Sequence, residues 1–403
     1  MKRSSRLRRL TACGVLVAGA ACTSGGGEDA AYTAVDSAGV TIAQNAVPAA
    51  PRNLWQIDPE PAVDIGVLEG EEVYQLFDVS DAGRFADGTL VVANGGSKEL
   101  RFYDASGRFL FAAGGEGEGP GEFRGMGNLA IVGDSVHAHD YALSRIAVFT
   151  SGGEFVRSFR VELPGGDPAW VLDALPDGRW LVTKSFVFSP SEVSLVVRDT
   201  LPYMLIDAEG TFLDTLVVSP GVEFFVVGTA QSASASSLVF GRSTQYAVAP
   251  GRLYVGDSDR YEIFGLAPSG TLELIVRSDR EPVPVGAAEI EAVKAERLED
   301  APSDNWRRNL ERLFADMPIP STLPAFDALA ADPAGHLWVM EASAPTDGPR
   351  TWSVFDRDGR WRGTVETPAG LTVREVGEDH VLGTWRDELG VEHVRVHELE
   401  REE

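Results

Sequence analysis

Cysteine is nearly absent from this 403-residue chain, which contains only Cys13 and Cys22. No cysteine follows Cys22, so the rest of the chain can form neither a disulfide nor a cysteine-ligated metal site. Long apolar runs are missing as well. The apolar stretch LTACGVLVAGAA at residues 10–21 is too short for a membrane-spanning helix, and no other segment is long and apolar enough.

Basic residues are also scarce, with 35 Lys and Arg against 61 Asp and Glu and a net charge of −26. This balance argues against nucleic acid as a partner, because phosphate binding depends on Lys and Arg. It equally argues against broad contact with an anionic membrane surface. The motifs G-x-S-x-G and H-E-x-x-H and the EF-hand loop do not occur, so no complete catalytic set can be assembled from local motifs.

The N-terminus carries a separate signal. The basic stretch MKRSSRLRR precedes the apolar run, which predicts a signal peptide over residues 1–21. The sequence AGAAC, which ends at Cys22, resembles the lipobox of bacterial lipoproteins. The resemblance implies cleavage before Cys22, lipid on its thiol and a place in the cell envelope, at the outer membrane or periplasmic side. The alternative is an ordinary secretory signal. Residues 22–37 are expected to form a flexible tether.

The stretch GGEGEGPGEFRG at residues 114–125 raises the question of phosphate binding. A dinucleotide-binding loop needs GxGxxG between a strand and a helix. Pro120 and Glu122 stand where the third glycine would be required, and the three glutamates of the stretch would repel a phosphate. We therefore interpret the stretch as a connector between two strands.

Two patterns recur along the chain. One is a β-hairpin with glycine in its turn, as in RFYDASGRF (101–109), VFTSGGEF (148–155), LIDAEGTF (205–212), IFGLAPSGTL (263–272) and VFDRDGRW (354–361). The other is a turn and a short apolar strand before each hairpin, as in ADGTLVVAN (86–94), GDSVHAHD (133–140), PDGRWLVTK (176–184), PGRLYVGD (250–257), PAGHLWVME (333–341) and GEDHVLGTW (377–385). The last copy leads into a sixth hairpin on a shorter turn, RDELGVEHVRVHEL (386–399). Six such units predict an all-β fold, a single six-bladed β-propeller over residues 38–403.

The last unit ends after its third strand, near His397. We expect an N-terminal strand to supply the missing one and close the ring, with residues 38–45 and 62–67 as the candidates.

These units resemble NHL repeats, in particular those of bacterial six-bladed β-propeller lipoproteins. The stretch GEGEGPGEF is the strongest local match, and the resemblance covers about residues 60–400. In that family the stretch links the outer strand of one blade to the inner strand of the next, which implies that Phe123 packs where the second blade begins. The resemblance implies a fold and no particular activity, because propellers have many unrelated functions.

Residues 285–317 interrupt the repeat and predict a helical hairpin. Ser303 is a candidate N-cap, and Trp306, Leu310, Leu313 and Phe314 recur at helical spacing on one face. The hairpin packs on the side of a blade or forms a lid over one mouth of the central channel; both alternatives remain open at this stage.

His137 and His139 are the candidate metal ligands. They stand two apart on a strand, so both side chains point to the same face and could bind one Zn²⁺ or Ca²⁺ ion. The structural alternative is that both imidazoles pack between blades.

Five residues near strand ends are candidates for partner binding at a rim: Arg145, Lys184, Tyr261, Trp385 and Arg386. Trp385 has the alternative of packing in a blade core. We expect a monomeric, non-catalytic binding module for a protein, peptide or glycan, with no cofactor and with membrane contact only through its anchor. The alternative is a metal-dependent hydrolase or lyase, since some six-bladed propellers are metal-dependent lactonases and NHL-type propellers include a zinc lyase.

Overall fold

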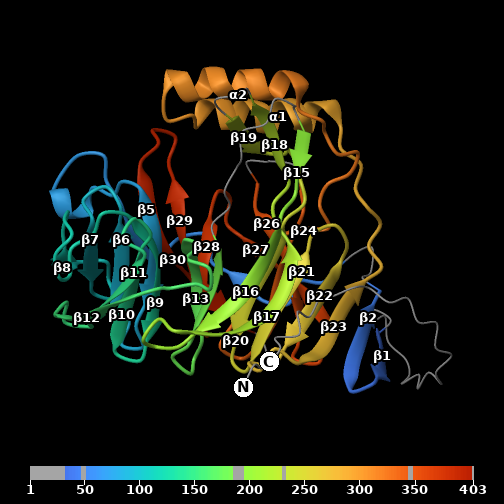
Figure 1. The fold of residues 1–403 in the computed structure, drawn as a ribbon, viewed down its shortest axis with the longest axis horizontal. Coiled ribbons are helices and arrows are strands. Elements are labelled where there is room, and N and C mark those ends of the chain that lie inside the picture. The colour runs from blue at the N-terminus through green and yellow to red at the C-terminus, as the bar shows by residue number, and fades with distance from the viewer. Residues whose placement is uncertain (1–31, 47–50, 185–194, 229–232, 344–347, 402–403) are drawn as a thin grey trace.

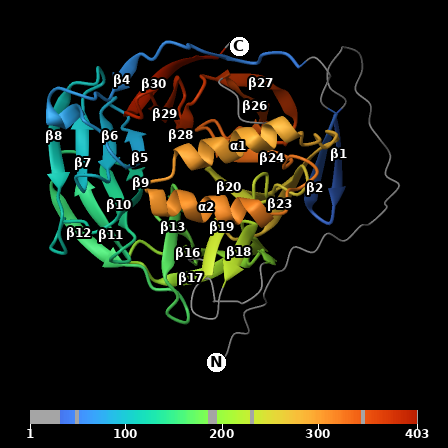
Figure 2. The same ribbon diagram turned by 90° about the horizontal axis from the view of Figure 1, so that it is seen from above.

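The computed structural model describes residues 32–46, 51–184, 195–228, 233–343 and 348–401. The predicted signal peptide, Cys22 and the first part of the tether therefore lie outside the described residues. The rest is an all-β propeller, in which six sheets stand around a central axis (Figures 1 and 2). In the described part of the chain, no helix has the length and apolar character needed to cross a membrane.

Each blade is an antiparallel sheet whose strands follow chain order from the axis outward. Blade 1 contains β5 (Val79–Arg84), β6 (Leu90–Asn94), β7 (Glu99–Tyr103) and β8 (Phe109–Gly114); blade 2 contains β9 (Met126–Val132), β10 (Ser135–Asp140), β11 (Arg145–Thr150) and β12 (Phe155–Arg160); blade 3 contains β13 (Ala169–Ala174), β14 (Trp180–Lys184), β16 (Thr200–Ile206) and β17 (Phe212–Pro220). Blade 4 contains β20 (Thr244–Ala249), β21 (Arg252–Asp257), β22 (Glu262–Leu266) and β23 (Leu272–Ser278); blade 5 contains β24 (Phe326–Ala331), β25 (Leu337–Glu341), β26 (Arg350–Phe355) and β27 (Trp361–Thr367); blade 6 contains β28 (Thr372–Val376), β29 (His380–Arg386) and β30 (Glu392–Glu400).

The predicted hairpins form between the third and fourth strands of blades 1–5. Their turn glycines, Gly107, Gly153, Gly210, Gly270 and Gly359, have φ between 76° and 88°. A side chain would be strained at this φ, which explains why glycine recurs at the same place in these five units. The glycine-rich stretch connects β8 to β9, and Phe123 is fully buried against Phe149, with ring centroids 5.9 Å apart.

The two candidate closing strands lie in different places. Residues 62–67 contain β4 (Val63–Ile65), which pairs antiparallel with β30 of blade 6, and β3 (Gln56–Ile57) pairs farther along the same strand. Residues 38–45 contain β2 (Val40–Asn45), which instead pairs parallel with β23 at the outer edge of blade 4. Thus residues 38–45 do not close the ring.

The tether prediction extended too far. Residues 32–37 form β1 (Tyr32–Ser37), which pairs with β2 as a hairpin and widens blade 4 to six strands. A turn with positive φ at Ala38 and Gly39 joins the two strands, and the Tyr32 hydroxyl donates a hydrogen bond to the Asp358 carbonyl in blade 5. These contacts order a segment that composition alone assigned to a linker.

Six hydrophobic clusters hold the ring together, one between each pair of neighbouring blades. The cluster between blades 6 and 1 joins Ile65, Leu382 and Val394 to Leu90 and Tyr103. Because β4 contributes Ile65 to this cluster, the N-terminal segment both completes blade 6 and seals it against blade 1. No blade in the described chain is held to its neighbour by a disulfide, so burial of these apolar side chains is the main interaction that stabilises the contact between blades.

The predicted helical hairpin is present as α1 (Ala287–Glu299) and α2 (Asp304–Asp316). The Ser303 hydroxyl accepts a hydrogen bond from the Trp306 N–H, as expected of an N-cap. Leu310, Leu313 and Phe314 are buried, whereas Trp306 is 51% exposed and does not belong to the packed face. The helices pack on a small seventh sheet made of β15 (Leu195–Val197), β18 (Phe224–Gly228) and β19 (Ala233–Ser237).

The ring closure generates the first prediction. We expect Ile65→Ala to lower the free energy of unfolding by about 2–4 kcal/mol, because it opens a cavity in the seal between the last and first blades. Denaturant titration of the purified protein measures this change. Val35→Ala on β1 is the matched control, since Val35 is 43% exposed and its loss should cost less than about 0.5 kcal/mol. Equal effects of the two changes would contradict the seal.

Candidate functional site in the central channel

The six inner strands enclose a central cavity of about 610 Å³. Every blade contributes to its wall through β5, β9, β13, β20, β24 or β28. Most of the wall consists of small and aliphatic side chains from these strands, such as Ala130, Ala247 and Ala330. The charged residues on this wall are Asp81, Arg84, Asp173, Asp332, Arg374 and Glu375.

Irregular pairing places charged residues on this wall. The register between first and second strands shifts at Val79/Asp81 in blade 1, at Val171/Asp173 in blade 3 and at Val373/Glu375 in blade 6. Each shift marks a β-bulge, which bends the strand and re-aims its side chains. Asp81, Asp173 and Arg374 lie at these bulges and line the cavity.

The two aspartates are held in surroundings that disfavour their charge. Asp81 accepts hydrogen bonds from the N–H groups of Leu129 and Ala82, at 3.0 and 2.9 Å, and burial raises its pKa to about 6. Asp173 accepts one bond from the Ala174 N–H at 2.7 Å. Burial raises the pKa of Asp173 to about 7, and the nearby charge of Asp81 raises it further. Both carboxyl groups thus change charge close to neutral pH.

A guanidinium and two neutral polar groups share the cavity with the aspartates. Arg374 is exposed on the cavity wall, and its charge lowers the pKa of Asp81 against the effect of burial. The Tyr246 hydroxyl and the Asn128 amide both donate to the Leu172 carbonyl, at 3.0 and 3.1 Å. Three further charged residues line the cavity but pair with residues outside it: Arg84 with Asp379, Asp332 with His336 and Arg401, and Glu375 with His380. The arrangement thus brings Asp81, Asp173 and Arg374 together with fixed neutral polar groups in one cavity. Strongly perturbed carboxyl groups in such a cavity indicate a functional site.

The helical pair lies above one face of the ring and extends across its middle (Figures 1 and 2). It leaves the ring between blades 4 and 5, after β23 and before β24. Along its length, Arg297 of α1 donates to the Ser237 carbonyl of the seventh sheet at 2.7 Å. At its tip, Asp300 pairs with Arg386 of blade 6 at 3.7 Å. The insertion therefore bridges the mouth of the channel and does not pack on the side of a blade, which is the placement that the lid alternative required.

His137 and His139 share one face of β10, and that face points to blade 3. Their rings lie 5.3 Å from Trp180 and 6.0 Å from Trp170, measured between centroids. Burial lowers the pKa of each imidazole to about 4, so both are neutral at physiological pH. The described residues contain no group of three or more His, Cys, Asp or Glu side chains that could hold a metal ion. This geometry fits the packing alternative for the pair.

The five candidate rim residues do not meet in one site. Arg145 donates to the carbonyls of Glu118, Gly119 and Glu122 and so fixes the glycine-rich connector. Lys184 pairs with Asp199 at 3.1 Å. These two side chains therefore have partners within their own blades or connectors.

In blade 6, the Trp385 indole N–H donates to the Ala369 carbonyl, and the Arg395 guanidinium lies 3.4 Å from the indole centroid. Trp385 also packs on the hydrophobic cluster between blades 5 and 6, as the core alternative predicts. Arg386 pairs with Glu392 at 2.9 Å in addition to Asp300. Tyr261, the last of the five, is buried at the wall of a separate cavity near the base of the helical pair.

The channel residues Asp81, Asn128, Asp173, Tyr246 and Arg374 were not predicted from the sequence. One recurring pattern starts at the turn that follows each inner strand and covers the second strand, and the other covers the third and fourth strands, so both omit the inner strand. A usable signal exists in DVSDAGR, WVLDALPDG and LTVREVGED, where a charged residue stands in a short apolar run just before a turn. At this place in the repeat, a charged residue on the inner strand predicts a side chain that faces the axis.

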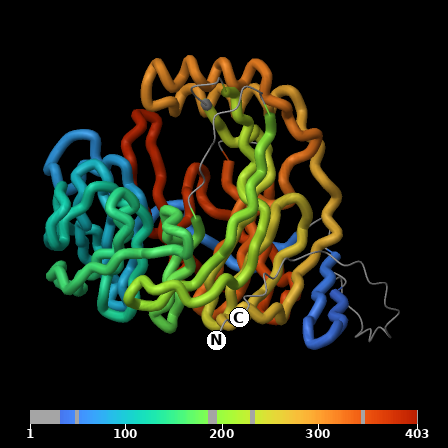
Figure 3. The backbone as a smooth tube through the Cα atoms, viewed as in Figure 1, coloured from blue at the N-terminus to red at the C-terminus, as the bar shows by residue number. Residues whose placement is uncertain are grey.

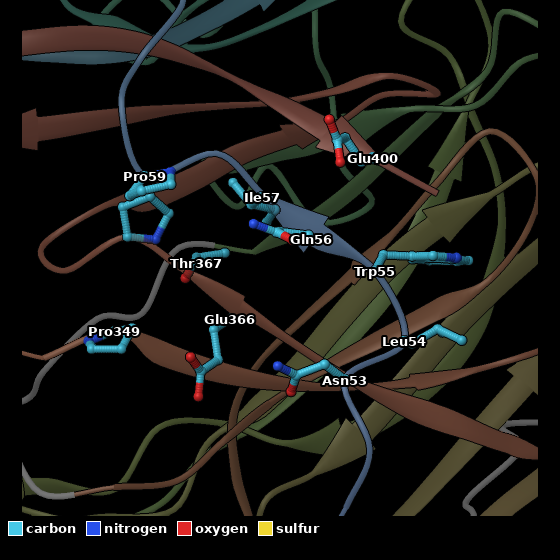
Figure 4. Close-up of a pocket in the computed structure, with 11 residues that line it drawn as sticks. Asn53, Leu54, Trp55, Gln56, Ile57, Pro59, Pro349, Glu366, Thr367 and Glu400 are labelled. Atoms are coloured by element: carbon cyan, nitrogen blue, oxygen red, sulfur yellow. The ribbon is translucent and has the colours of Figure 1, made fainter. Parts of the chain in front are cut away.

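A further cavity of about 520 Å³ lies on the outside of the ring, where the N-terminal segment passes between β27 and the end of β30 (Figure 4). Asn53, Trp55 and Gln56 line it from that segment, and Glu366 and Glu400 add two carboxylates. None of its described lining residues is basic. The channel is the stronger candidate because it gathers both signs of charge and the perturbed carboxyl groups.

No protein-family model matches the chain, and no curated protein matches it. Among solved structures, it is similar to a member of the DUF4221 family from Bacteroides vulgatus, with 10% identity, a TM-score of 0.54, and coverage of 87% of this chain and 99% of that one. It is also similar to a putative exported protein from Bacteroides fragilis (11% identity, TM-score 0.46, 90% and 100% covered) and to virginiamycin B lyase from Staphylococcus aureus (10%, 0.39, 86% and 99%). The first likeness concerns the fold alone, and the two lower scores support no conclusion about this chain.

The raised pKa of Asp173 predicts a pH-dependent stability. Below about pH 4 the carboxyl is protonated in the folded and unfolded states alike, so it does not lower the free energy of unfolding. Above about pH 7 it is ionised in both states, and the folded state carries the full cost of a buried charge. We expect Asp173→Asn to match the wild type near pH 4 and to be more stable at pH 8 by about 1–3 kcal/mol.

Denaturant titrations across pH 4–8 measure the difference. The exposed Glu154 supplies the control, because Glu154→Gln removes one charge outside the channel and should leave the pH profile unchanged. An Asp173→Asn variant whose stability parallels the wild type at every pH would show that the carboxyl is not perturbed.

Proposed function

We propose that the chain is a non-catalytic binding module of the bacterial cell envelope whose ligand enters the central channel. In this proposal the NHL-type propeller is anchored by lipid on Cys22, stays monomeric and needs no cofactor. The observation that carries it is the channel itself, with Asp81, Asp173 and Arg374 on its wall. A cavity of this size suits a small ligand or the end of a chain.

The channel charges favour a peptide end among protein, peptide and glycan ligands. Two carboxylates can accept hydrogen bonds from a free amino group, and the Arg374 guanidinium can bind a carboxylate. The Asn128 and Tyr246 side chains lie on the same wall and can orient an amide. The helical pair above the mouth would limit entry to one end of the channel or to a segment that slides beneath it.

The alternative is a metal-dependent hydrolase or lyase with His137 and His139 as ligands. The specific observation in its favour is that both imidazoles are neutral and that His137 Nδ1 and both nitrogens of His139 are buried without a hydrogen-bond partner in the described chain. Against it, their rings pack on Trp180 and Trp170, and neither histidine lines the channel. The binding module therefore has the better support.

We expect uncapped tri- to pentapeptides to bind the wild type, and to bind more tightly at pH 8 than at pH 5, because Asp81 and Asp173 ionise over this interval. Isothermal titration calorimetry against the same peptides with acetylated and amidated ends tests the role of the termini. The double variant Asp81→Asn/Asp173→Asn and the variant Arg374→Gln should each weaken binding by about tenfold or more. Glu154→Gln should bind like the wild type.

Two results would refute a channel ligand of this kind. One is the absence of measurable peptide binding, and the other is equal affinity of the wild type and both channel variants.

Elemental mass spectrometry separates the two functions. We expect less than about 0.1 equivalent of metal in the purified protein, and no change on His137→Ala/His139→Ala, because neutral imidazoles already packed on indole rings make a poor ligand set. One equivalent of zinc or calcium that disappears in the double variant would favour the metal-dependent enzyme instead.

A further inference from the structure

The three most exposed large apolar side chains of the described residues lie on two neighbouring loops. Leu68 and Phe77, 60% and 73% exposed, belong to the β4–β5 loop (66–78). Leu389, 74% exposed, belongs to the β29–β30 turn (387–391). Both loops stand on the side of the ring that carries the helical pair, and the β29–β30 hairpin rises toward that pair (Figure 3). We call these two loops together the rim surface.

The two loops start from the same place on β30. At one end of the β4–β5 loop, a Cβ on Gly66 would lie 2.5 Å from the Glu392 carbonyl oxygen, so the two backbones touch. At the other end, the Val79 N–H donates to the Glu392 carboxylate at 2.8 Å. Because Glu392 follows Leu389 by only three residues, the exposed apolar side chains of both loops belong to one surface.

Blade 1 holds the β4–β5 loop in one shape. The guanidinium of Arg101, which is only 3% exposed, donates to the carbonyls of Glu72 and Gln75 at 2.8 and 2.9 Å. The buried Tyr103 hydroxyl donates to the Val73 carbonyl at 2.6 Å. A surface that is ordered in advance loses little conformational entropy when a partner binds.

The exposure of Phe77 is fixed by the backbone around it. The Gly96 N–H donates to the Phe77 carbonyl, and the Phe77 N–H donates to Asn94 Oδ1, both at 2.8 Å. The next residue, Asp78, accepts a bond from the Gly95 N–H at 2.9 Å and has a φ of 56°, which is uncommon for a residue other than glycine. Such backbone persists where the surrounding structure enforces it, and it is common at binding sites. The fold therefore presents this aromatic ring to solvent in a defined position.

The charge of the rim surface has one sign. Neither loop contains a basic residue. The exposed acidic residues of the two loops are Glu69, Glu71, Glu72, Asp78 and Glu388. Of the basic side chains next to them, Lys98 donates to the Gly95 carbonyl and Arg386 pairs with Glu392. The rim surface thus combines apolar side chains with an excess of carboxylates.

This combination selects among the partners that could cover the rim surface. A second copy of this chain would bring the same carboxylates against it, and each copy has a net charge of −26. The anionic lipids of a membrane would be repelled in the same way. A peptide segment that carries aliphatic or aromatic side chains together with Lys or Arg matches both the apolar contacts and the charge.

We propose that the rim surface docks a basic, apolar segment of a partner protein. Phe77 and Leu389 supply the main apolar contacts, and Glu71 and Glu72 attract the basic side chains. The segment needs no free terminus, so this interaction is separate from the peptide end that we assign to the channel.

Isothermal titration calorimetry with an acetylated and amidated heptapeptide, in which Lys alternates with Leu or Phe, tests the proposal. We expect this peptide to bind the wild type saturably. A counterpart with Glu for Lys and another with Ser for Leu and Phe should each bind at least tenfold more weakly. Because the ends of all three peptides are blocked, the termini cannot direct them into the channel.

The double variant Phe77→Ser/Leu389→Ser should weaken binding of the Lys peptide at least tenfold. Glu71→Gln/Glu72→Gln should weaken it about threefold or more and reduce its dependence on salt. Neither variant should lower the melting temperature, because these side chains are exposed. Leu213→Ser is the matched control: Leu213 is 46% exposed on the outer strand of blade 3, and its loss should leave binding unchanged.

The proposal is overturned if the Lys peptide does not bind, or if Phe77→Ser/Leu389→Ser binds it like the wild type. Sedimentation velocity that shows a dimer of the wild type but not of this variant would overturn it in favour of a second copy. Flotation of the wild type alone with phosphatidylcholine vesicles would overturn it in favour of a membrane. Asp81→Asn/Asp173→Asn should bind the blocked Lys peptide like the wild type, which keeps this test separate from that of the channel.

Discussion

Burial of apolar side chains between neighbouring blades is the interaction on which the rest of this molecule depends. A blade has two broad faces, and neither can be covered by its own strands. The six inter-blade clusters therefore have to form together, and the cluster that contains Ile65 closes the circle. With no cysteine after Cys22, the chain has no covalent link that could substitute for this seal.

The closed ring fixes the inner strands from both sides, and this gives the channel charges their positions. A flexible strand would relax around a buried carboxyl group and expose it to water. Here the β-bulges that aim Asp81 and Asp173 toward the axis lie within sheets that cannot move apart. The fold consequently bears two carboxyl groups whose ionisation is disfavoured, a cost that is common where function and stability conflict. Packing energy in the clusters offsets that cost.

The sequence revealed the parts of the fold that have local signals. Turn glycines such as Gly107 and Gly359 need positive φ, and Ser303 caps a helix, so hairpins and the helical pair could be predicted. The inner strands could not, because the bulges break the alternation of apolar and polar residues. The β1 strand was missed because five of its six residues are exposed, so its sequence has no apolar alternation and its order comes from pairing with β2. Trp306 has helical spacing but lies where no partner covers it.

The sites were harder to predict than the fold because they are assembled from distant segments. Asp81, Asp173 and Arg374 come from three blades and meet only through ring geometry. The rim surface joins the β4–β5 loop to the β29–β30 turn from opposite ends of the chain, and nothing in either stretch marks the other. Single residues such as Arg145 and Lys184 looked suited to binding by type and position, yet each has an internal partner. Residue type predicts what a side chain can bind, and topology decides what it meets.

The two ends of the helical pair are attached by different forces. Its base is held by backbone hydrogen bonds between the connecting segments and by the buried face of α2 on the seventh sheet. At the tip, Asp300 contacts blade 6 through its ion pair with Arg386, whose side chain is 54% exposed. Salt screens such a pair but hardly affects a packed helix face. A rise in ionic strength therefore weakens the attachment of the tip of the insertion, while its base and the ring keep their packing.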